Sequence, residues 1–320
     1  MFLFDPMLEC SNSWCESEDS FCQFIIRGER KNSNTMSKKV AVITGAGSGI
    51  GLAVAQRLSV GGWTVVLSGR TASKLDEAAK SLKGDGHLCV PADVSVDSDV
   101  EHLFRTVEKT YGRLDLLFNN AGINCSFSSF EDVSPEDFKK VISTNVIGVF
   151  LCSQAAIKIM KKNGGGRIVN NGSISAHVPR PGSAPYTASK HAVSALTKCL
   201  ALDGRASNVA CGQIDYGNVV TELSAAMNKA GSGAMQANGA LLEEPTMTLE
   251  DAAGEFIVIL DGGAVLSCVM FHDILYAHRL TRFCIVKIAE TFWTMANLPL
   301  SANVLNMTVM ATKMPFVGRG

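Results

Sequence analysis

The stretch Val40-Ala-Val-Ile-Thr-Gly-Ala-Gly-Ser-Gly-Ile-Gly51 decides the fold that we predict for this chain. Its first five residues are apolar and partly β-branched, which predicts a buried strand. The glycines follow, and residues 52–58 after them are helix-like. A strand, a glycine turn and a helix in this order place free N–H groups at a helix N-terminus, where a phosphate can bind. The alternative is a tight turn with a purely structural role.

Strand-like and helix-like segments alternate along the chain after this turn. Apolar, β-branched runs predict the strands, and amphipathic or well-capped runs predict the helices. The longest helical run begins with Ser134-Pro135, an N-cap residue followed by a proline in the first turn. The predicted strands are 64–68, 87–90, 114–118, 166–171, 209–214 and 303–310, and the predicted helices are 72–82, 97–111, 134–160 and 185–205.

Composition narrows the class of protein. The 320 residues carry a net charge of −1 and are 47% hydrophobic, which suits a globular chain with a sizeable core. Near-neutral charge gives no electrostatic reason to expect nucleic acid or an anionic membrane as a partner. No uninterrupted apolar run reaches the roughly 18–20 residues of a membrane span. We therefore expect no nucleic acid and no membrane as partners.

Ten cysteines occur without a Cys-x-x-Cys pair. Cys89 lies in a strand-like run, and Cys152 and Cys199 lie in helix-like runs. We interpret the cysteines as reduced, buried small hydrophobes, which predicts a reducing, cytoplasmic location and no metal site.

The end of the second predicted strand bears on cofactor choice. In a doubly wound sheet, an acid at this point would bind the ribose 2′-hydroxyl, whereas an arginine accommodates a 2′-phosphate. Ser68 and Gly69 supply no acid, and Arg70 follows, so NADP(H) is favoured over NAD(H). The alternative for Arg70 is a solvated cation at a helix start. After the third strand, Asp93 is placed to meet the adenine edge, although a lone Asp is often a helix cap.

Tyr186 and Lys190 are four residues apart in the segment Tyr186-Thr-Ala-Ser-Lys190. On one helix their side chains share a face, and the positive charge favours the phenolate. Ser173 lies thirteen residues upstream, just after the fifth predicted strand. Asn145 falls in the middle of a predicted helix, where its propensity is poor, so it marks either a kink or a functional water site.

These motifs together resemble the short-chain dehydrogenase/reductase family. The residues that carry the resemblance are Thr44-Gly45-x-x-x-Gly49-Ile50-Gly51, Asn119-Asn120-Ala121-Gly122, Asn145, Ser173, Tyr186 and Lys190, in the family's order. The resemblance covers residues 38–253 and 290–312. It implies an α/β fold: a single, Rossmann-like domain with a doubly wound, mostly parallel seven-stranded sheet flanked by helices.

The resemblance also implies a role for each residue. Tyr186 is the general acid or base, and Ser173 hydrogen-bonds the substrate oxygen. Lys190 assists Tyr186 and holds the nicotinamide ribose, and Asn145 positions a water that links Lys190 to solvent. The implied cofactor-binding residues are Gly45, Ser48, Gly49, Ile50, Gly51, Arg70, Asp93, Val94, Asn120, Ala121, Gly122, Tyr186, Lys190, Val219 and Thr221.

Three neighbouring residues are interpreted less directly. The thirteen-residue interval to Tyr186 favours Ser173 over Ser175 as the catalytic serine. His177 lies in the same loop, and we expect a surface residue rather than a second acid. Tyr216 replaces the proline usual in the family, which puts the local turn in doubt rather than the chemistry.

The predicted function is an NADP(H)-dependent oxidoreductase that interconverts a carbonyl and an alcohol of a small molecule. A narrower alternative is a 3-oxoacyl carrier-protein reductase, although no basic cluster suits an acidic carrier protein. An alternative of another class is a catalytically silent nucleotide-binding or interaction protein. Residues 222–247 are interpreted as a mobile lid whose small apolar residues suit an uncharged or partly apolar substrate. By resemblance we expect a homodimer or homotetramer.

Two segments fall outside the family pattern. Residues 1–35 predict a disordered extension before a domain at 36–312, with a docking or targeting tail as the alternative. Residues 249–253 and 290–298 would form one amphipathic helix, but residues 254–289 interrupt it. Because this insertion has no helical periodicity, we interpret it as a splicing or gene-model artefact; the alternative is a genuine lid or partner surface. The tail 313–320 is expected near a subunit interface.

Overall fold

The computed structural model describes residues 38–125, 128–219, 234–235, 241–242, 256–260, 265–268 and 280–310. The extension 1–35, Thr221, most of the predicted lid, residues 249–253 and the tail 313–320 lie outside the described residues. Within the predicted lid, the short strands β7 (Ala234–Met235) and β8 (Leu241–Leu242) pair antiparallel.

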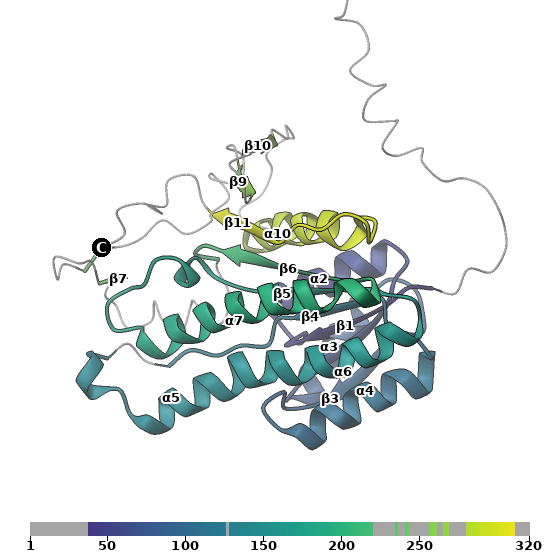
Figure 1. The fold of residues 1–320 in the computed structure, drawn as a ribbon, viewed down its shortest axis with the longest axis horizontal. Helices are drawn as coiled ribbons and strands as arrows, with labels where there is room; N and C mark the ends of the chain where they lie inside the picture. The colour runs from purple at the N-terminus through teal and green to yellow at the C-terminus, as the bar shows by residue number, and fades with distance from the viewer. Residues whose placement is uncertain are drawn as a thin grey trace, which may run out of the picture. The chain divides into compact units, whose positions relative to one another are not determined.

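Seven parallel strands form the body of one sheet (Figure 1). Their order is β3-β2-β1-β4-β5-β6-β11, so the chain first builds outward from β1 in one direction and then restarts on its other side. Loops that leave neighbouring strands in opposite directions open a crevice between β1 and β4, where open α/β sheets bind ligands. The predicted seven-stranded, doubly wound sheet is confirmed. The strands are β1 (Val40–Thr44), β2 (Thr64–Gly69), β3 (Leu88–Pro91), β4 (Leu116–Asn119), β5 (Gly166–Asn171), β6 (Val209–Tyr216) and β11 (Asn306–Met310).

The insertion adds two strands to one edge of this sheet. Strand β9 (Phe256–Leu260) pairs antiparallel with β11, and β10 (Val265–Cys268) pairs antiparallel with β9, so the sheet has nine strands in total. Helix α10 (Leu280–Asn297) also begins inside the insertion, ten residues before the predicted resumption at Glu290. No Gly or Pro between 280 and 290 ends a helix, which explains the extension.

Helices cover both faces of the sheet. Helix α2 (Gly49–Val60), α3 (Ala72–Lys80) and α10 bury apolar side chains on one face. On the other face, α4 (Asp97–Tyr111), α6 (Gly148–Lys162) and the end of α7 (Ala184–Asp203) pack around a second cluster. Alternate residues of β1 point to opposite clusters, as the period of a strand requires. Burial on both faces explains why the β1 sequence is apolar throughout.

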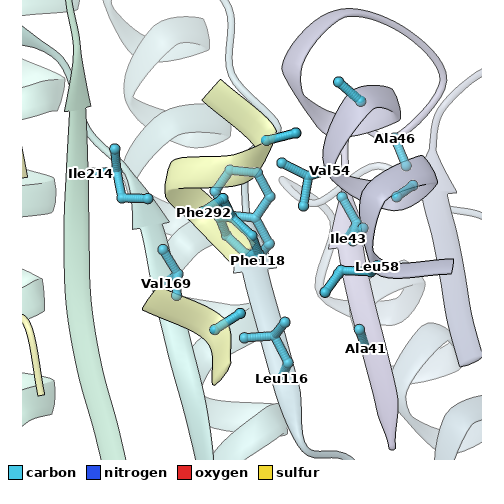
Figure 2. Packing of buried hydrophobic residues seen from close by; sticks show 14 of the residues in the cluster. Ala41, Ile43, Ala46, Val54, Leu58, Leu116, Phe118, Val169, Ile214 and Phe292 are labelled. Atoms are coloured by element: carbon cyan, nitrogen blue, oxygen red, sulfur yellow. The ribbon is translucent and has the colours of Figure 1, made fainter. Parts of the chain in front are cut away.

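The rings of Phe118 on β4 and Phe292 on α10 meet in the first cluster, with centroids 4.4 Å apart (Figure 2). Both side chains are fully buried, and Ile43, Val54 and Leu58 surround them. This contact fixes α10 against the centre of the sheet. The residues after Glu290 therefore pack as the predicted amphipathic helix should.

The predicted helix 134–160 is one helical stretch, Pro135–Lys162, made of three parts: α5 (Pro135–Ile142), a π-helical turn (Ser143–Ile147) and α6. Ser134 caps it, because its hydroxyl accepts the backbone N–H of Asp137 at 3.0 Å. This stretch is long and apolar enough, by length and composition alone, to cross a membrane. It nevertheless buries Cys152, Ala156 and Met160 in the second cluster, which is how a core helix of a globular domain behaves.

The cysteines only partly follow the prediction of buried thiols. Cys89, Cys125, Cys152, Cys199 and Cys211 are free. Burial raises the pKa of the Cys152 and Cys211 thiols to about 12. Cys199 is exposed on α7, so its interpretation as a buried hydrophobe is wrong. Its helix position faces away from the sheet, and an apolar sequence neighbourhood alone does not reveal that.

Candidate active site

The glycine turn between β1 and α2 has the geometry of an anion cradle. Gly45 and Gly49 have φ angles of 64° and 55°, in the left-handed region that favours glycine. A Cβ on Gly51 would lie 2.4 Å from the Gly45 carbonyl oxygen. Ser48 stands at the N-cap of α2 without a side-chain capping hydrogen bond, so the first-turn N–H groups, including that of Ile50, are left for a ligand. The turn therefore fits the pyrophosphate of a dinucleotide.

The segment after β4 is tied directly to this turn. The Thr44 hydroxyl accepts the backbone N–H groups of Asn120 and Ala121, each at 3.0 Å. The Asn120 amide donates to the carbonyl oxygens of Thr44 at 2.9 Å and Gly45 at 3.2 Å. Its amide oxygen accepts from the Asn171 side chain on β5 at 2.8 Å. The asparagine thus joins three strands at the crevice.

Arg70 and Asp93 follow the carboxyl ends of β2 and β3. The Arg70 residue is exposed. The Asp93 carboxylate accepts the backbone N–H and the hydroxyl of Ser95, at 2.9 and 2.6 Å. Burial opposes the charged form of Asp93, but the Ser95 hydrogen bonds and the Arg70 charge outweigh it and lower the pKa. Asp93 therefore forms a local turn and does not cap α4, whose N-cap is Val96; its contact with adenine stays a prediction.

Helix α7 brings Tyr186 and Lys190 together. The Lys190 ammonium lies 5.4 Å from the centroid of the Tyr186 ring. Lys190 is buried, and its Nζ donates to the carbonyl oxygen of Asn171 at the end of β5, at 2.8 Å. The Tyr186 side chain is half-buried. A cation held beside a phenol at the carboxyl end of a parallel sheet is suited to proton transfer.

Asn145 stands at the π-helical turn and connects two parts of the site. Its side chain is 2% exposed. It accepts the backbone N–H of Ile123 at 2.8 Å and donates to the Ile123 carbonyl oxygen at 2.9 Å. It also donates to the Ser189 hydroxyl at 3.0 Å, which in turn donates to the Tyr186 carbonyl oxygen. The predicted irregularity at Asn145 is therefore present, and the water site stays a prediction.

Ser173 follows β5 and begins a short 3-10 turn, Ile174–Ala176. Its hydroxyl accepts the backbone N–H of Ser175 at 3.1 Å, and its own backbone N–H donates to the Asp215 carboxylate at 2.8 Å. Both serines are 7% exposed. The choice of Ser173 over Ser175 stays a prediction, since burial does not separate them.

Asp215 is a site residue that was not predicted from the sequence. The predicted strand stops at Ile214, but β6 continues to Tyr216 because Asp215 and Tyr216 pair with Thr308 and Val309 of β11. Asp215 is fully buried. The sequence signal was available: a carboxylate directly follows the predicted strand 209–214, at the end where open α/β sheets bind ligands.

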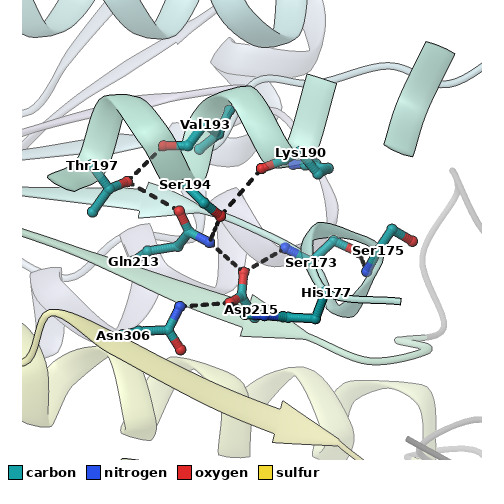
Figure 3. Close-up of polar contacts among 10 residues, drawn as sticks. All are labelled: Ser173, Ser175, His177, Lys190, Val193, Ser194, Thr197, Gln213, Asp215 and Asn306. Carbon is teal, nitrogen blue, oxygen red and sulfur yellow. Dashed lines mark hydrogen bonds and ion pairs between the residues drawn. The ribbon is translucent and has the colours of Figure 1, made fainter. Parts of the chain in front are cut away.

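His177 is exposed, as expected, and it also contacts a buried carboxylate. Its Nε2 lies 2.7 Å from an Asp215 carboxylate oxygen, and its side chain is 37% exposed (Figure 3). The contact itself was not predicted, because Asp215 is 38 positions away in sequence and no local pattern indicates it.

Tyr216 is buried beside Ile214 and Val219 in the first apolar cluster. Burial raises the pKa of its phenol. The turn that follows is held to the sheet, because the Gly217 N–H donates to the Val309 carbonyl oxygen at 2.8 Å. The replacement of proline is therefore accommodated.

The predicted cofactor-binding residues that the structure describes lie together at the carboxyl ends of the parallel strands. They lie at or beyond the carboxyl ends of β1 to β6, or on α7. They are Gly45, Ser48, Gly49, Ile50, Gly51, Arg70, Asp93, Val94, Asn120, Ala121, Gly122, Tyr186, Lys190 and Val219.

Comparison with known proteins agrees with this geometry. A family model described as short chain dehydrogenase matches residues 39–231, well over half of the chain. The chain is 36% identical over 222 residues to dehydrogenase/reductase SDR family member 4 of Bos taurus, covering 68% of this chain and 77% of that protein. It is 37% identical over 202 residues to a 3alpha-hydroxysteroid dehydrogenase of Mediterraneibacter gnavus, covering 61% of this chain and 79% of that protein.

A solved structure extends the likeness over more of the chain. It is a 3-ketoacyl-(acyl-carrier-protein) reductase from Brucella melitensis complexed with NADH, with 28% identity and a TM-score of 0.64. The alignment covers 84% of this chain and 96% of that chain. The chain therefore belongs to the short-chain dehydrogenase/reductase family, as an oxidoreductase that acts on the CH–OH group with NAD(P).

Proposed function

We propose that this protein is an NADP(H)-dependent oxidoreductase that interconverts a carbonyl and an alcohol, with Tyr186 as the general acid and base. The observation that carries the proposal is the Lys190 ammonium, buried 5.4 Å from the Tyr186 ring on the same helix. A fixed positive charge stabilises the phenolate that remains when the phenol gives up its proton. The cofactor supplies or accepts a hydride when bound, and the protein supplies orientation and the proton.

Tyr186 and the residues around it have separate roles in proton transfer, charge stabilisation and cofactor binding. In carbonyl reduction, the Tyr186 phenol donates its proton to the substrate oxygen; in alcohol oxidation it takes the proton back. The Ser173 hydroxyl donates a hydrogen bond to that oxygen and stabilises the charge that develops on it. Lys190 holds the nicotinamide ribose as well as assisting Tyr186. Asn145, held between the loop after β4 and α7, would position the water through which Lys190 regains contact with solvent.

The nucleotide half of the site would hold the cofactor along the crevice. The N–H groups at the start of α2 face the pyrophosphate, while Val219 and Thr221 are proposed near the nicotinamide carboxamide. The preference for NADP(H) over NAD(H) rests on Arg70, which is exposed after β2, and on the lack of an acid at Ser68 and Gly69. An arginine here can pair with the 2′-phosphate.

The substrate class that we propose is an uncharged or partly apolar carbonyl compound. The support is the apolar composition of residues 222–247 and the similarity to a protein described as a 3alpha-hydroxysteroid dehydrogenase. A second candidate is reduction of a 3-oxoacyl chain on a carrier protein, which the similarity to the Brucella melitensis structure favours.

We also propose a homodimer or homotetramer in a reducing, cytoplasmic compartment. Three exposed apolar side chains, Phe138, Ile147 and Phe150, lie along the stretch Pro135–Lys162 and would suit a subunit contact. The free cysteines support the compartment.

The experiment is consumption of NADPH by the purified full chain with a panel of ketones, aldehydes, a steroid ketone and a 3-oxoacyl thioester. Turnover of ketones supports the proposal, and preference for a carrier-bound thioester supports the second candidate. No turnover of any substrate, despite measurable NADPH binding, would favour a catalytically silent nucleotide-binding protein.

A further inference from the structure

Asp215 is a fully buried carboxylate at the end of β6, and each of its two oxygens accepts two hydrogen bonds. It accepts the Ser173 backbone N–H at 2.8 Å and the Gln213 amide at 2.7 Å through Oδ1. Through Oδ2 it accepts the Asn306 amide and His177 Nε2, both at 2.7 Å. A buried carboxylate is costly unless such bonds satisfy it. Four of them indicate a built arrangement rather than a stray acid.

The chain around Asp215 is shaped for close approach. A Cβ on Gly172, the residue before Ser173, would lie 1.8 Å from Asp215 Oδ1. Any side chain at this position would therefore displace the carboxylate or the Ser173 backbone. Glycine at 172 lets the start of the serine loop lie directly on the carboxylate.

The network continues from Asp215 to the helix that carries Lys190 (Figure 3). The Gln213 amide also donates to the Ser194 hydroxyl at 2.8 Å, and that hydroxyl donates to the Lys190 carbonyl oxygen at 3.3 Å. The Gln213 amide oxygen accepts the Thr197 hydroxyl at 3.0 Å. One buried carboxylate is thus connected to both chain segments that supply the proposed catalytic groups.

A second hydrogen bond connects the loop between Ser173 and Tyr186 to the chain after β6. The Arg180 guanidinium donates to the Asn218 side-chain oxygen at 2.7 Å. His177 and Arg180 are three residues apart, and so are their partners Asp215 and Asn218. The loop between Ser173 and Tyr186 is therefore held to one short stretch at two points.

We propose that His177 and Asp215 are a positioning pair for Ser173. The carboxylate fixes the Ser173 backbone N–H, and His177, donating to the other carboxylate oxygen, keeps the carboxylate from turning away. The Ser173 hydroxyl is then held in one place for the substrate oxygen. In this proposal His177 acts through Ser173 and does not itself exchange protons with the substrate. The proposal rests on the role proposed above for Ser173.

The test compares His177→Ala with His177→Gln in the full chain. The glutamine amide can replace the donor that Nε2 provides, whereas alanine cannot. We expect His177→Ala to lower kcat by at least about 10-fold with the Kd for NADPH unchanged, because a small displacement of a catalytic group is costly. His177→Gln should keep kcat within about 3-fold of wild type, a loss well under 1.4 kcal/mol. His102→Gln, an exposed histidine on α4, is the matched control.

The double variant Ser173→Ala/His177→Ala distinguishes positioning from an independent role. If His177 acts through Ser173, the double variant has the kcat of Ser173→Ala alone. Multiplying losses, or an unchanged kcat in His177→Ala, would overturn the proposal.

Hydrogen exchange of the Ser173 amide provides a readout that needs no turnover. Faster exchange in His177→Ala than in His177→Gln and wild type supports the pair; equal exchange in all three overturns it. Wild-type protein that reduces no carbonyl would overturn the proposed function instead, and the exchange result would still decide whether the pair fixes Ser173.

Discussion

The Nζ of Lys190 donates to the carbonyl oxygen of Asn171 at 2.8 Å, which ties the middle of α7 to the end of β5. The same Asn171 donates through its side chain to Asn120, which follows the neighbouring strand β4. The ammonium that faces Tyr186 is therefore fixed from the sheet rather than by its own helix. A lysine with its rotamer set in this way provides a charge at a constant place beside the phenol.

Replacing Lys190 by methionine should remove this charge while keeping the length of the buried side chain. We expect kcat to fall by at least about 100-fold, because general acid catalysis of this size depends on the state of Tyr186. Binding of NADPH should weaken as well, since Lys190 is proposed to hold the ribose. Steady-state kinetics and fluorescence titration with NADPH measure the two effects.

Lys198→Met is the matched control, because Lys198 is exposed on the same helix. It should keep wild-type kcat and NADPH affinity. A Lys190→Met protein with wild-type kcat would contradict the assignment of Lys190.

Arg70→Ala should change the choice of cofactor. Loss of a charge-assisted contact with the 2′-phosphate costs about 1.5–3 kcal/mol, so the KM for NADPH should rise by about 10-fold or more while the KM for NADH stays constant. Arg105→Ala removes an exposed arginine on α4 and should leave both values unchanged. An unaltered NADPH/NADH preference in Arg70→Ala would mean that another group recognises the phosphate.

The thiols should react with iodoacetamide in an order set by burial. Burial raises the pKa of Cys152 and Cys211 to about 12, so at pH 8 only about one thiol in 10⁴ is ionised, and access is also blocked. Among the five cysteines whose side chains the structure describes, Cys199 is exposed and should be labelled first. Peptide mass spectrometry after brief labelling at pH 8 gives the order. Equal labelling of Cys152 and Cys199 in native protein would contradict the core described above.

Removal of residues 254–289 should leave the fold intact, because we propose that this segment is a splicing or gene-model artefact. The part of α10 that remains still has its anchors on α2: Arg57 Nε lies 2.5 Å from Glu290 Oε1, and the Arg57 guanidinium lies 4.0 Å from the Trp293 ring. We expect Tm equal to or above that of the full chain and unchanged kcat, measured by thermal unfolding and NADPH consumption.

A lower Tm or loss of activity on deletion would indicate a genuine insertion. Sequencing the transcript across Ala253 and Glu290 tests the origin of the segment separately. An abundant contiguous message that encodes it would count against the artefact.

Much of the sheet could be predicted because its signals are local. The strands Val40–Thr44 and Gly166–Asn171 and the helix Asp97–Tyr111 have the predicted bounds. A continuous apolar, β-branched run marks the first strand, an amphipathic pattern marks the helix, and a turn follows each of them. The start of α10 at Leu280 was not predicted. The family pattern places this helix after the insertion, whereas residues 280–289 contain no residue that ends a helix.

In the candidate site too, the features that depend on local sequence could be predicted and those that depend on distant partners could not. The approach of Tyr186 and Lys190 follows from four-residue spacing on a helix, and the cradle follows from the glycines. The environment of Asp215 depends on partners from β11, from the serine loop and from its own strand, up to 91 positions away. No local pattern reports such contacts. The contact of His177 with Asp215 was therefore not predicted, and the extension of β6 that buries Asp215 was missed for the same reason.

The measurement that tests the central claim most directly is the single-turnover rate of carbonyl reduction by Tyr186→Phe beside that of Tyr111→Phe. Tyr111 lies on α4, where its hydroxyl donates to the Gly86 carbonyl oxygen at 2.7 Å, so its variant controls for loss of a phenol elsewhere. The account predicts a rate at least about 100-fold below wild type for Tyr186→Phe, with NADPH still bound, and a wild-type rate for Tyr111→Phe. Equal rates for wild type and Tyr186→Phe would contradict it.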